Sequence, residues 1–193
     1  MKIFNNIFDN DLLLEILKHS QTTKEDGSKG NYWTNLSWPE GILKDSGIVL
    51  CSDIREEFGQ QLFETCVKNK VFVRPDGVDL GVPTNSAIML YNWQRYSYIP
   101  FHSDNHVDVG TTLYLNTEWD YDWGGGQIVE EGDTKKLRLE YPEFNKMTVN
   151  YSYQGEKHST TMVHPSAPDR VCVQMFISFD EGKRTGFESK RTR

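Results

Sequence analysis

The residues best suited to chemistry are a histidine and an aspartate two positions apart, His102 and Asp104, which follow the extended stretch 98–101. Side chains two positions apart on a strand point to the same face, so the imidazole and the carboxylate can meet one metal ion. Either of two later histidines, His158 or His164, would complete a set of two imidazoles and one carboxylate. That set is the facial triad of non-haem Fe(II) sites, which leaves coordination positions open.

The histidine and aspartate pair alone is a weak signal, because a solvated loop histidine is its usual explanation. Only one of His158 and His164 can join it, since six extended residues span roughly 20 Å whereas an Fe–N bond is about 2 Å. His106 shares the face of the pair, but a fourth strong ligand would occupy a position that the chemistry needs open. Spacing therefore predicts three ligands and leaves the third open between two histidines.

A cation is expected beside this site, because the stretch 170–179 alternates as a strand does. The apolar members of the alternation are Val171, Val173, Met175, Ile177 and Phe179. The other members are Arg170, Cys172, Gln174, Phe176 and Ser178. If the apolar face packs on helices, Arg170 points into the β structure, where an unpaired guanidinium is costly and expects an anionic partner.

The elements that must position these residues are helices first and strands afterwards. Leucine and isoleucine spacing predicts a helix over 10–19 with Asp9 as its N-cap, and apolar residues every four positions predict another over 53–69 with Ser52 as its cap. Residues 21–35 are expected to form a loop. Short runs between turn residues predict strands at 84–92, 98–102, 110–116, 126–131, 135–141, 146–152, 157–163 and 170–179. This order favours a mainly β jelly roll or barrel supported by N-terminal helices.

Length and composition restrict the alternatives. The 193 residues predict a single domain, with 1–70 as helical support, 71–180 as the β core and 181–193 as a basic tail. A net charge of −7 argues against binding driven by nucleic-acid phosphates. No apolar stretch approaches the roughly 20 residues of a membrane span, and the N-terminus lacks a signal-peptide core, so we expect a cytoplasmic protein.

Three segments carry a family resemblance. They are Tyr-Asn-Trp-Gln-Arg-Tyr-Ser-Tyr-Ile-Pro-Phe-His-Ser-Asp at 91–104, Leu-Tyr-Leu-Asn-Thr-Glu-Trp at 113–119 and Gly-Gly-Gly-Gln-Ile at 124–128. In order and spacing they resemble the catalytic domain of prolyl 4-hydroxylase-like Fe(II)/2-oxoglutarate dioxygenases. The resemblance covers about residues 84–180, and it implies the cupin-like double-stranded β-helix form of the jelly roll.

The resemblance also implies roles for individual residues. The segment 158–163 resembles the family's His-Gly-Val-x-Pro-Val, which favours His158 as the third iron ligand and leaves His164 as the runner-up. The twelve positions from His158 to Arg170 are somewhat more than the family usually has. Arg170 would hold the far carboxylate of 2-oxoglutarate, with the hydroxyl of Tyr114 as a second donor and Tyr91 as a further contact.

The implied reaction is hydroxylation of an unactivated C–H bond by Fe(II), 2-oxoglutarate and O2, with succinate and carbon dioxide as coproducts and ascorbate as an additional cofactor. No side chain beyond the metal ligands is expected to be catalytic. The family favours a prolyl residue in a peptide or protein as substrate. A groove for it could be formed by the aromatic residues Trp93, Trp119, Tyr121 and Trp123.

Three alternatives stay open. The segment 96–104 is also similar to alkylation-repair demethylases, which act on nucleobases, but those carry a second arginine where this chain has Phe176. A small molecule could be the substrate of the same chemistry. The third alternative is a cupin-like module that binds a metal or a sugar without turnover.

Overall fold

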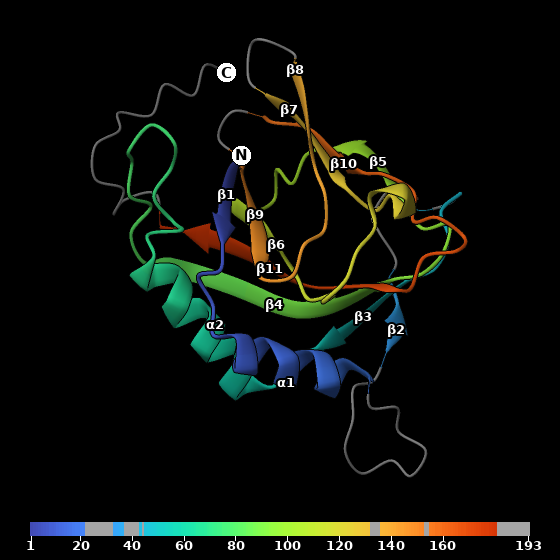
Figure 1. Ribbon diagram of the computed structural model, residues 1–193. Coiled ribbons are helices and arrows are strands. Elements are labelled where there is room, and N and C mark those ends of the chain that lie inside the picture. The colour runs from blue at the N-terminus through green and yellow to red at the C-terminus, as the bar shows by residue number, and fades with distance from the viewer. Residues whose placement is uncertain (22–32, 37–42, 44, 132–135, 153–154, 181–193) are drawn as a thin grey trace.

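Two antiparallel sheets form the molecule, in a computed structural model that describes residues 1–21, 33–36, 43, 45–131, 136–152 and 155–180. The larger sheet has the order β1-β9-β6-β11-β4-β3-β2, and the smaller one has the order β5-β10-β7-β8. In Figure 1 helices α1 and α2 lie on one side of the larger sheet, and the smaller sheet lies on the other. This is the predicted jelly roll with N-terminal helices.

The element bounds are as follows. The larger sheet contains β1 Lys2–Asn5, β2 Thr34–Asn35, β3 Val49–Asp53, β4 Pro83–Trp93, β6 Val109–Tyr114, β9 Lys146–Tyr151 and β11 Arg170–Phe179. The smaller sheet contains β5 Ile99–His102, β7 Gln127–Glu131, β8 Lys136–Glu140 and β10 His158–Thr160. The helices are α1 Asn10–Gln21, α2 Glu56–Lys68 and a short 3-10 helix, Tyr121–Trp123. Every strand predicted between residues 84 and 179 has a counterpart among β4 to β11.

The main core lies between the helices and the outer face of the larger sheet. The alternating apolar residues of β11 are buried there with Leu13 and Ile16 of α1 and Leu62 of α2. Burying each such side chain contributes about 1.5–3 kcal/mol, which fixes the β11 face toward the helices. The opposite face of β11, which carries Arg170, therefore points toward the smaller sheet, as the alternation predicts.

The helix starts were predicted with different success. Asp9 caps α1 as expected, because its Oδ1 accepts a hydrogen bond from the Leu12 backbone N–H at 3.0 Å. Ser52 does not cap α2, so that prediction is wrong. Ser52 is instead a buried residue of β3 that pairs with Leu90 of β4, and α2 begins after Arg55 without a side-chain cap.

The N-terminal third contains strands that the sequence patterns did not predict. Strand β1 pairs with β9, and β3 pairs with β4, so the region expected to be helical support also supplies edges of the larger sheet. In the expected loop 21–35, Thr34–Asn35 forms β2, while 22–32 lies outside the described residues. The expected basic tail 181–193 also lies outside them.

A small ion-pair network joins the two sheets. Lys146 of β9 binds Glu140 of β8 at 3.0 Å, and Glu140 also accepts from Arg138 at 2.8 Å. Burial raises the pKa of Glu140, but its hydrogen bonds with Lys146 and Arg138 outweigh burial and hold the pKa below its ordinary value. The smaller sheet is thereby fixed electrostatically against the larger one.

Two negative expectations can be compared with the structure. In the described part of the chain, no helix combines the length and the apolar character that crossing a bilayer requires. Cys51, Cys66 and Cys172 are buried as free thiols. Three cysteines without CxxC spacing likewise suggest neither a disulfide framework nor a zinc site.

Candidate active site

His102, Asp104 and His158 lie together between the two sheets. His102 ends β5 and is the register partner of His158 on β10, which places their ring centroids 4.3 Å apart. Asp104 Oδ2 is 3.4 Å from His158 Nε2, and Asp104 Oδ1 is 3.7 Å from His102 Nε2. One donor atom from each residue fits within 4.8 Å of the others. The pairing of β5 with β10 therefore assembles two imidazoles and one carboxylate.

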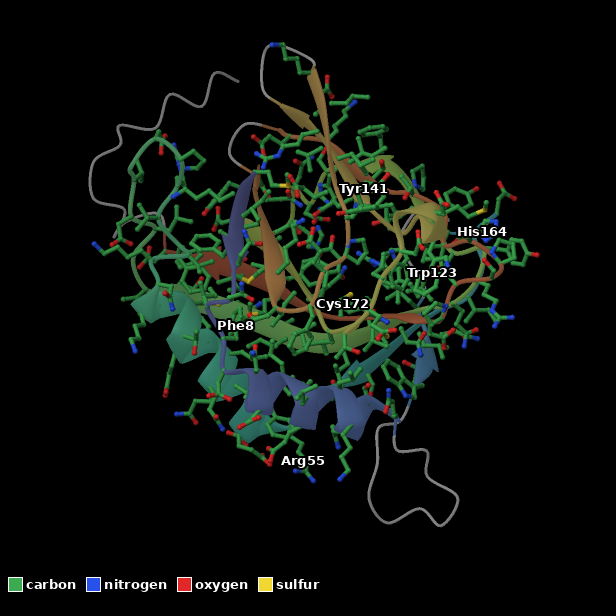
Figure 2. The ribbon with its side chains drawn as sticks, in the orientation of Figure 1. Phe8, Arg55, Trp123, Tyr141, His164 and Cys172 are labelled. Carbon is green, nitrogen blue, oxygen red and sulfur yellow. The ribbon has the colours of Figure 1, made fainter. Side chains whose placement is uncertain are left out.

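His164 is not part of this cluster. Its side chain is exposed, its Nδ1 lies 2.7 Å from Ser166 Oγ, and its backbone N–H donates to the Trp123 carbonyl at 2.9 Å. Figure 2 shows His164 near Trp123 at the edge of the molecule. Of the two histidines that the spacing left open, the structure brings only His158 to His102 and Asp104.

The protonation states in the cluster suit metal ligation. Burial raises the pKa of Asp104, but a hydrogen bond with His158 and the charges of His158 and His102 outweigh it and hold the pKa below its ordinary value. Burial, followed by the neighbouring His158, lowers the pKa of His102. An ionised carboxylate beside a neutral imidazole is the state that binds a divalent cation. Asp104 Oδ1 is buried without a hydrogen-bond partner, so this oxygen suits a metal ligand.

Gly110 makes room for the carboxylate. It lies on β6 beneath Asp104, and a Cβ atom at this position would lie 3.1 Å from Asp104 Oδ2, closer than ordinary van der Waals contact. Ser152 fixes the same loop from the other side, because its Oγ donates to the Asp104 carbonyl at 2.9 Å. The sequence patterns did not single out Gly110, since nothing in a lone glycine indicates what approaches it.

Arg170 is buried between two aromatic rings. It opens β11, is 1% exposed, and places its guanidinium carbon 5.0 Å from the ring centroids of both Trp93 and Tyr114. Its Nε and Nη1 atoms have no hydrogen-bond partner, and neither does the Tyr114 hydroxyl. Burial raises the pKa of Tyr114, with Arg170 opposing the shift, so the hydroxyl stays a donor. Buried donors without partners are the kind of groups that bind a carboxylate.

Tyr91 lies close to the unpaired donors of Arg170 and Tyr114, but it does not line the cavity described in the next paragraph. It faces the interior from β4, is buried, and pairs in register with Cys51 on one side and Cys172 on the other. Burial, then the two neighbouring thiols, raises the pKa of Tyr91. Trp93, two positions further along β4, lines the cavity in its place.

A small cavity that opens to solvent is lined by His102, Asp104 and His158. Its wall is rich in hydroxyl and carboxamide groups, namely Thr111, Thr112, Gln127, Asn150, Thr160 and Gln174. Asn150 Oδ1 and Gln174 Oε1 are buried without partners. Trp93, Ile99 and Phe176 supply the apolar part of the lining. Arg170 and Tyr114 do not line the cavity themselves, and Arg170 contacts its wall through Trp93.

Most of this lining was not predicted from the sequence. Gln174 and Phe176 are exceptions, because strand alternation placed them on the inward face of β11 with Arg170, and both line the cavity. Strand alternation along β9 could also have found Asn150, which lies opposite Gly110 of β6 in the sheet. Gln127 could not be found from its own strand alone, because its place in the cavity depends on a contact between the two sheets. Its Oε1 accepts a hydrogen bond from Thr148 of β9 at 2.5 Å.

No protein-family model and no curated protein matches the sequence. Several solved structures are similar in fold. A prolyl-4-hydroxylase from Pseudomonas putida matches with a TM-score of 0.71 and 14% identity, over 93% of this chain and 92% of that chain. A prolyl hydroxylase from Trichoplax adhaerens, in complex with a peptide fragment of the hypoxia inducible factor oxygen degradation domain, matches with a TM-score of 0.72 and 17% identity, over 94% and 84%.

A third similar structure is an oxidoreductase of the 2OG-Fe(II) oxygenase family from Burkholderia pseudomallei, with a TM-score of 0.57 and 12% identity. It covers 91% of this chain and 84% of that chain. At these identities the likeness concerns the fold. The chain therefore has the jelly-roll fold that prolyl hydroxylases and 2OG-Fe(II) oxygenases share, and it carries a His-Asp-His cluster inside that fold.

Proposed function

We propose that the protein is an Fe(II)- and 2-oxoglutarate-dependent dioxygenase. The observation that carries the proposal is the coexistence of the His-Asp-His cluster with a buried, unpaired guanidinium in the same interior. A non-catalytic metal-binding module needs the first feature but has no use for the second, which costs desolvation energy unless an anion arrives. The shared fold supports the same conclusion.

In this proposal His102, Asp104 and His158 hold Fe(II), which fits the lowered pKa values of Asp104 and His102. When bound, Fe(II) with 2-oxoglutarate and O2 supplies the oxidation of an unactivated C–H bond, with succinate and carbon dioxide as coproducts. The chain supplies the ligand geometry and a cavity whose apolar wall includes Trp93 and Ile99.

Arg170 and Tyr114 orient the far carboxylate of 2-oxoglutarate. The guanidinium offers two unpaired donor nitrogens, and the hydroxyl of Tyr114 beside it offers a third donor. Charge-assisted hydrogen bonds of this kind are about twice as strong as neutral ones. Tyr91 belongs to the same proposal as a further contact, because Tyr91 and Tyr114 are the two register partners of Cys172. Like Arg170 and Tyr114, Tyr91 does not itself line the cavity.

We further propose a prolyl residue in a peptide or protein as the substrate. Support comes from the Trichoplax adhaerens structure of the same fold, which is a prolyl hydroxylase in complex with a peptide fragment. The net charge of −7 and the presence of Phe176 on the cavity wall give no support to a nucleic-acid substrate.

The test is succinate release from 2-oxoglutarate by the Fe(II)-loaded protein, with ascorbate present, in response to a library of proline-containing peptides. We expect peptide-stimulated succinate formation and a peptide product heavier by one oxygen atom. Arg170→Leu should abolish both signals while Fe(II) binding persists, because the guanidinium does not touch the metal cluster. Absence of succinate with and without peptides would contradict the dioxygenase proposal, and succinate stimulated only by other substrates would contradict the prolyl assignment.

A further inference from the structure

The position of the Arg170 guanidinium is not fixed by hydrogen bonds at Nε or Nη1. Both atoms lack a partner, and the guanidinium carbon lies 5.0 Å from the ring centroids of both Trp93 and Tyr114. Cation–π attraction is less directional than a hydrogen bond, so these rings do not by themselves fix where the guanidinium lies. The depth at which the guanidinium lies therefore depends on how firmly the backbone of Arg170 is held.

Asn116 holds that backbone on both sides. Its Nδ2 donates to the Asp169 carbonyl at 2.9 Å, and its Oδ1 accepts from the Val171 N–H at 2.8 Å. These two peptide groups directly precede and follow Arg170. One carboxamide thus uses its donor and its acceptor together on the two neighbours of a single residue, which makes it a clip around the start of β11.

A second asparagine holds the same turn from the opposite side. Asn92 of β4 donates through Nδ2 to Asp169 Oδ2 at 3.1 Å, and Asn92 is the register partner of Val171. Asn116 follows β6, the other neighbour of β11. The turn that presents Arg170 is consequently tied to both adjacent strands, whereas Nε and Nη1 of the guanidinium have no hydrogen-bond partner.

We propose that Asn116 is a positioning residue that sets where the Arg170 guanidinium meets the far carboxylate of the diacid cosubstrate. The inference rests on the proposed function and adds a residue that touches neither metal nor cosubstrate. Its physical basis is that hydrogen bonds to a carboxylate lose strength steeply with distance and angle. A backbone that shifts by a fraction of an ångström moves the donors out of reach.

The experiment compares two acids on the Mn(II)-loaded protein without oxygen, by calorimetry. 2-Oxoglutarate carries the far carboxylate, and 2-oxobutyrate has the same metal-binding end without it. Asn116→Leu removes both clip hydrogen bonds at similar volume, and Asn116→Asp keeps the acceptor for the Val171 N–H. Asn85→Leu is the matched control, because Asn85 is an exposed asparagine of β4 away from the clip.

We expect wild type to bind 2-oxoglutarate more tightly than 2-oxobutyrate. Asn116→Leu should weaken 2-oxoglutarate about tenfold while Mn(II) and 2-oxobutyrate affinities stay unchanged, and Asn116→Asp should weaken it less. Asn85→Leu should behave as wild type. If Asn116→Leu does not fold, the smaller selective loss in Asn116→Asp carries the test.

Two results would overturn the reasoning, and they differ. If the asparagine variants weaken both acids equally, or lose Mn(II), Asn116 supports the fold in general and the inference is wrong. If wild type itself binds both acids equally, the assignment of Arg170 to the far carboxylate is wrong, and the proposed function fails before the role of Asn116 arises.

Discussion

Replacing Gly110 with alanine tests how tightly the sheet supports the metal cluster. The added Cβ would lie 3.1 Å from Asp104 Oδ2, whereas ordinary contact begins at 3.4 Å, so the carboxylate must retreat by about 0.3 Å. Ligand distances in a working metal site hold within about 0.2 Å. Changes that misplace a ligand indirectly typically cost 10–100-fold in metal affinity, so we expect Fe(II) to bind Gly110→Ala at least about tenfold more weakly.

The assay is anaerobic titration with Fe(II), together with chemical denaturation to measure the free energy of unfolding. Gly59→Ala is the control, because a Cβ at Gly59 in α2 meets nothing closer than 3.5 Å and alanine favours a helix by about 1 kcal/mol. The control should be more stable and bind Fe(II) as wild type does. A folded Gly110→Ala protein with wild-type Fe(II) affinity would refute the reasoning.

Three further measurements test other parts of the structure. The paired carboxylate of Glu140 has a folded pKa below its unfolded value of about 4.3, so its contribution to stability is present above that unfolded value and is lost as the pH falls through the folded pKa. Glu140→Gln should therefore reduce the fall of Tm at acid pH. An unchanged fall would contradict the pairing of Glu140 with Lys146. Gln174→Met removes a buried acceptor without a partner, so denaturation should show stability unchanged or higher by about 1 kcal/mol, and a clear loss would mean that the carboxamide is satisfied. His158→Ala should lose Fe(II) in anaerobic titration and His164→Ala should keep it, and the opposite result would exchange the two histidines as ligands.

The β core was predictable because the alternation of apolar and polar residues along a strand is visible in the sequence itself. Alternation in 170–179 indicated both the helix-facing side and the inward direction of Arg170, and both agree with the structure. The N-terminal strands were not predictable in the same way. Strand β1 has four residues, and its partner β9 lies far along the chain, so no local pattern reveals the pairing. Ser52 illustrates the same limit, because strand pairing overrode its preference for a helix N-cap.

The candidate site was predictable in part for a related reason. The spacing of His102 and Asp104 indicates a shared face, but spacing alone could not choose between His158 and His164, because that choice depends on which strand pairs with β5. Predicting the polar residues of the cavity wall would likewise have required knowing which strands pair. Residues such as Gln127 and Asn150 look like ordinary surface positions until two sheets close over them.

The pairing of β4 with β11 affects when the site can form during synthesis and folding. Contacts at this seam join residues 77 positions apart, as between Asn92 and Asp169, and such distant closures make folding slow. A nascent chain that has been synthesised only as far as β7 contains His102 and Asp104 but neither His158 nor Arg170. The three residues of the metal cluster can therefore meet only after β10 has been synthesised, and Arg170 joins them later still.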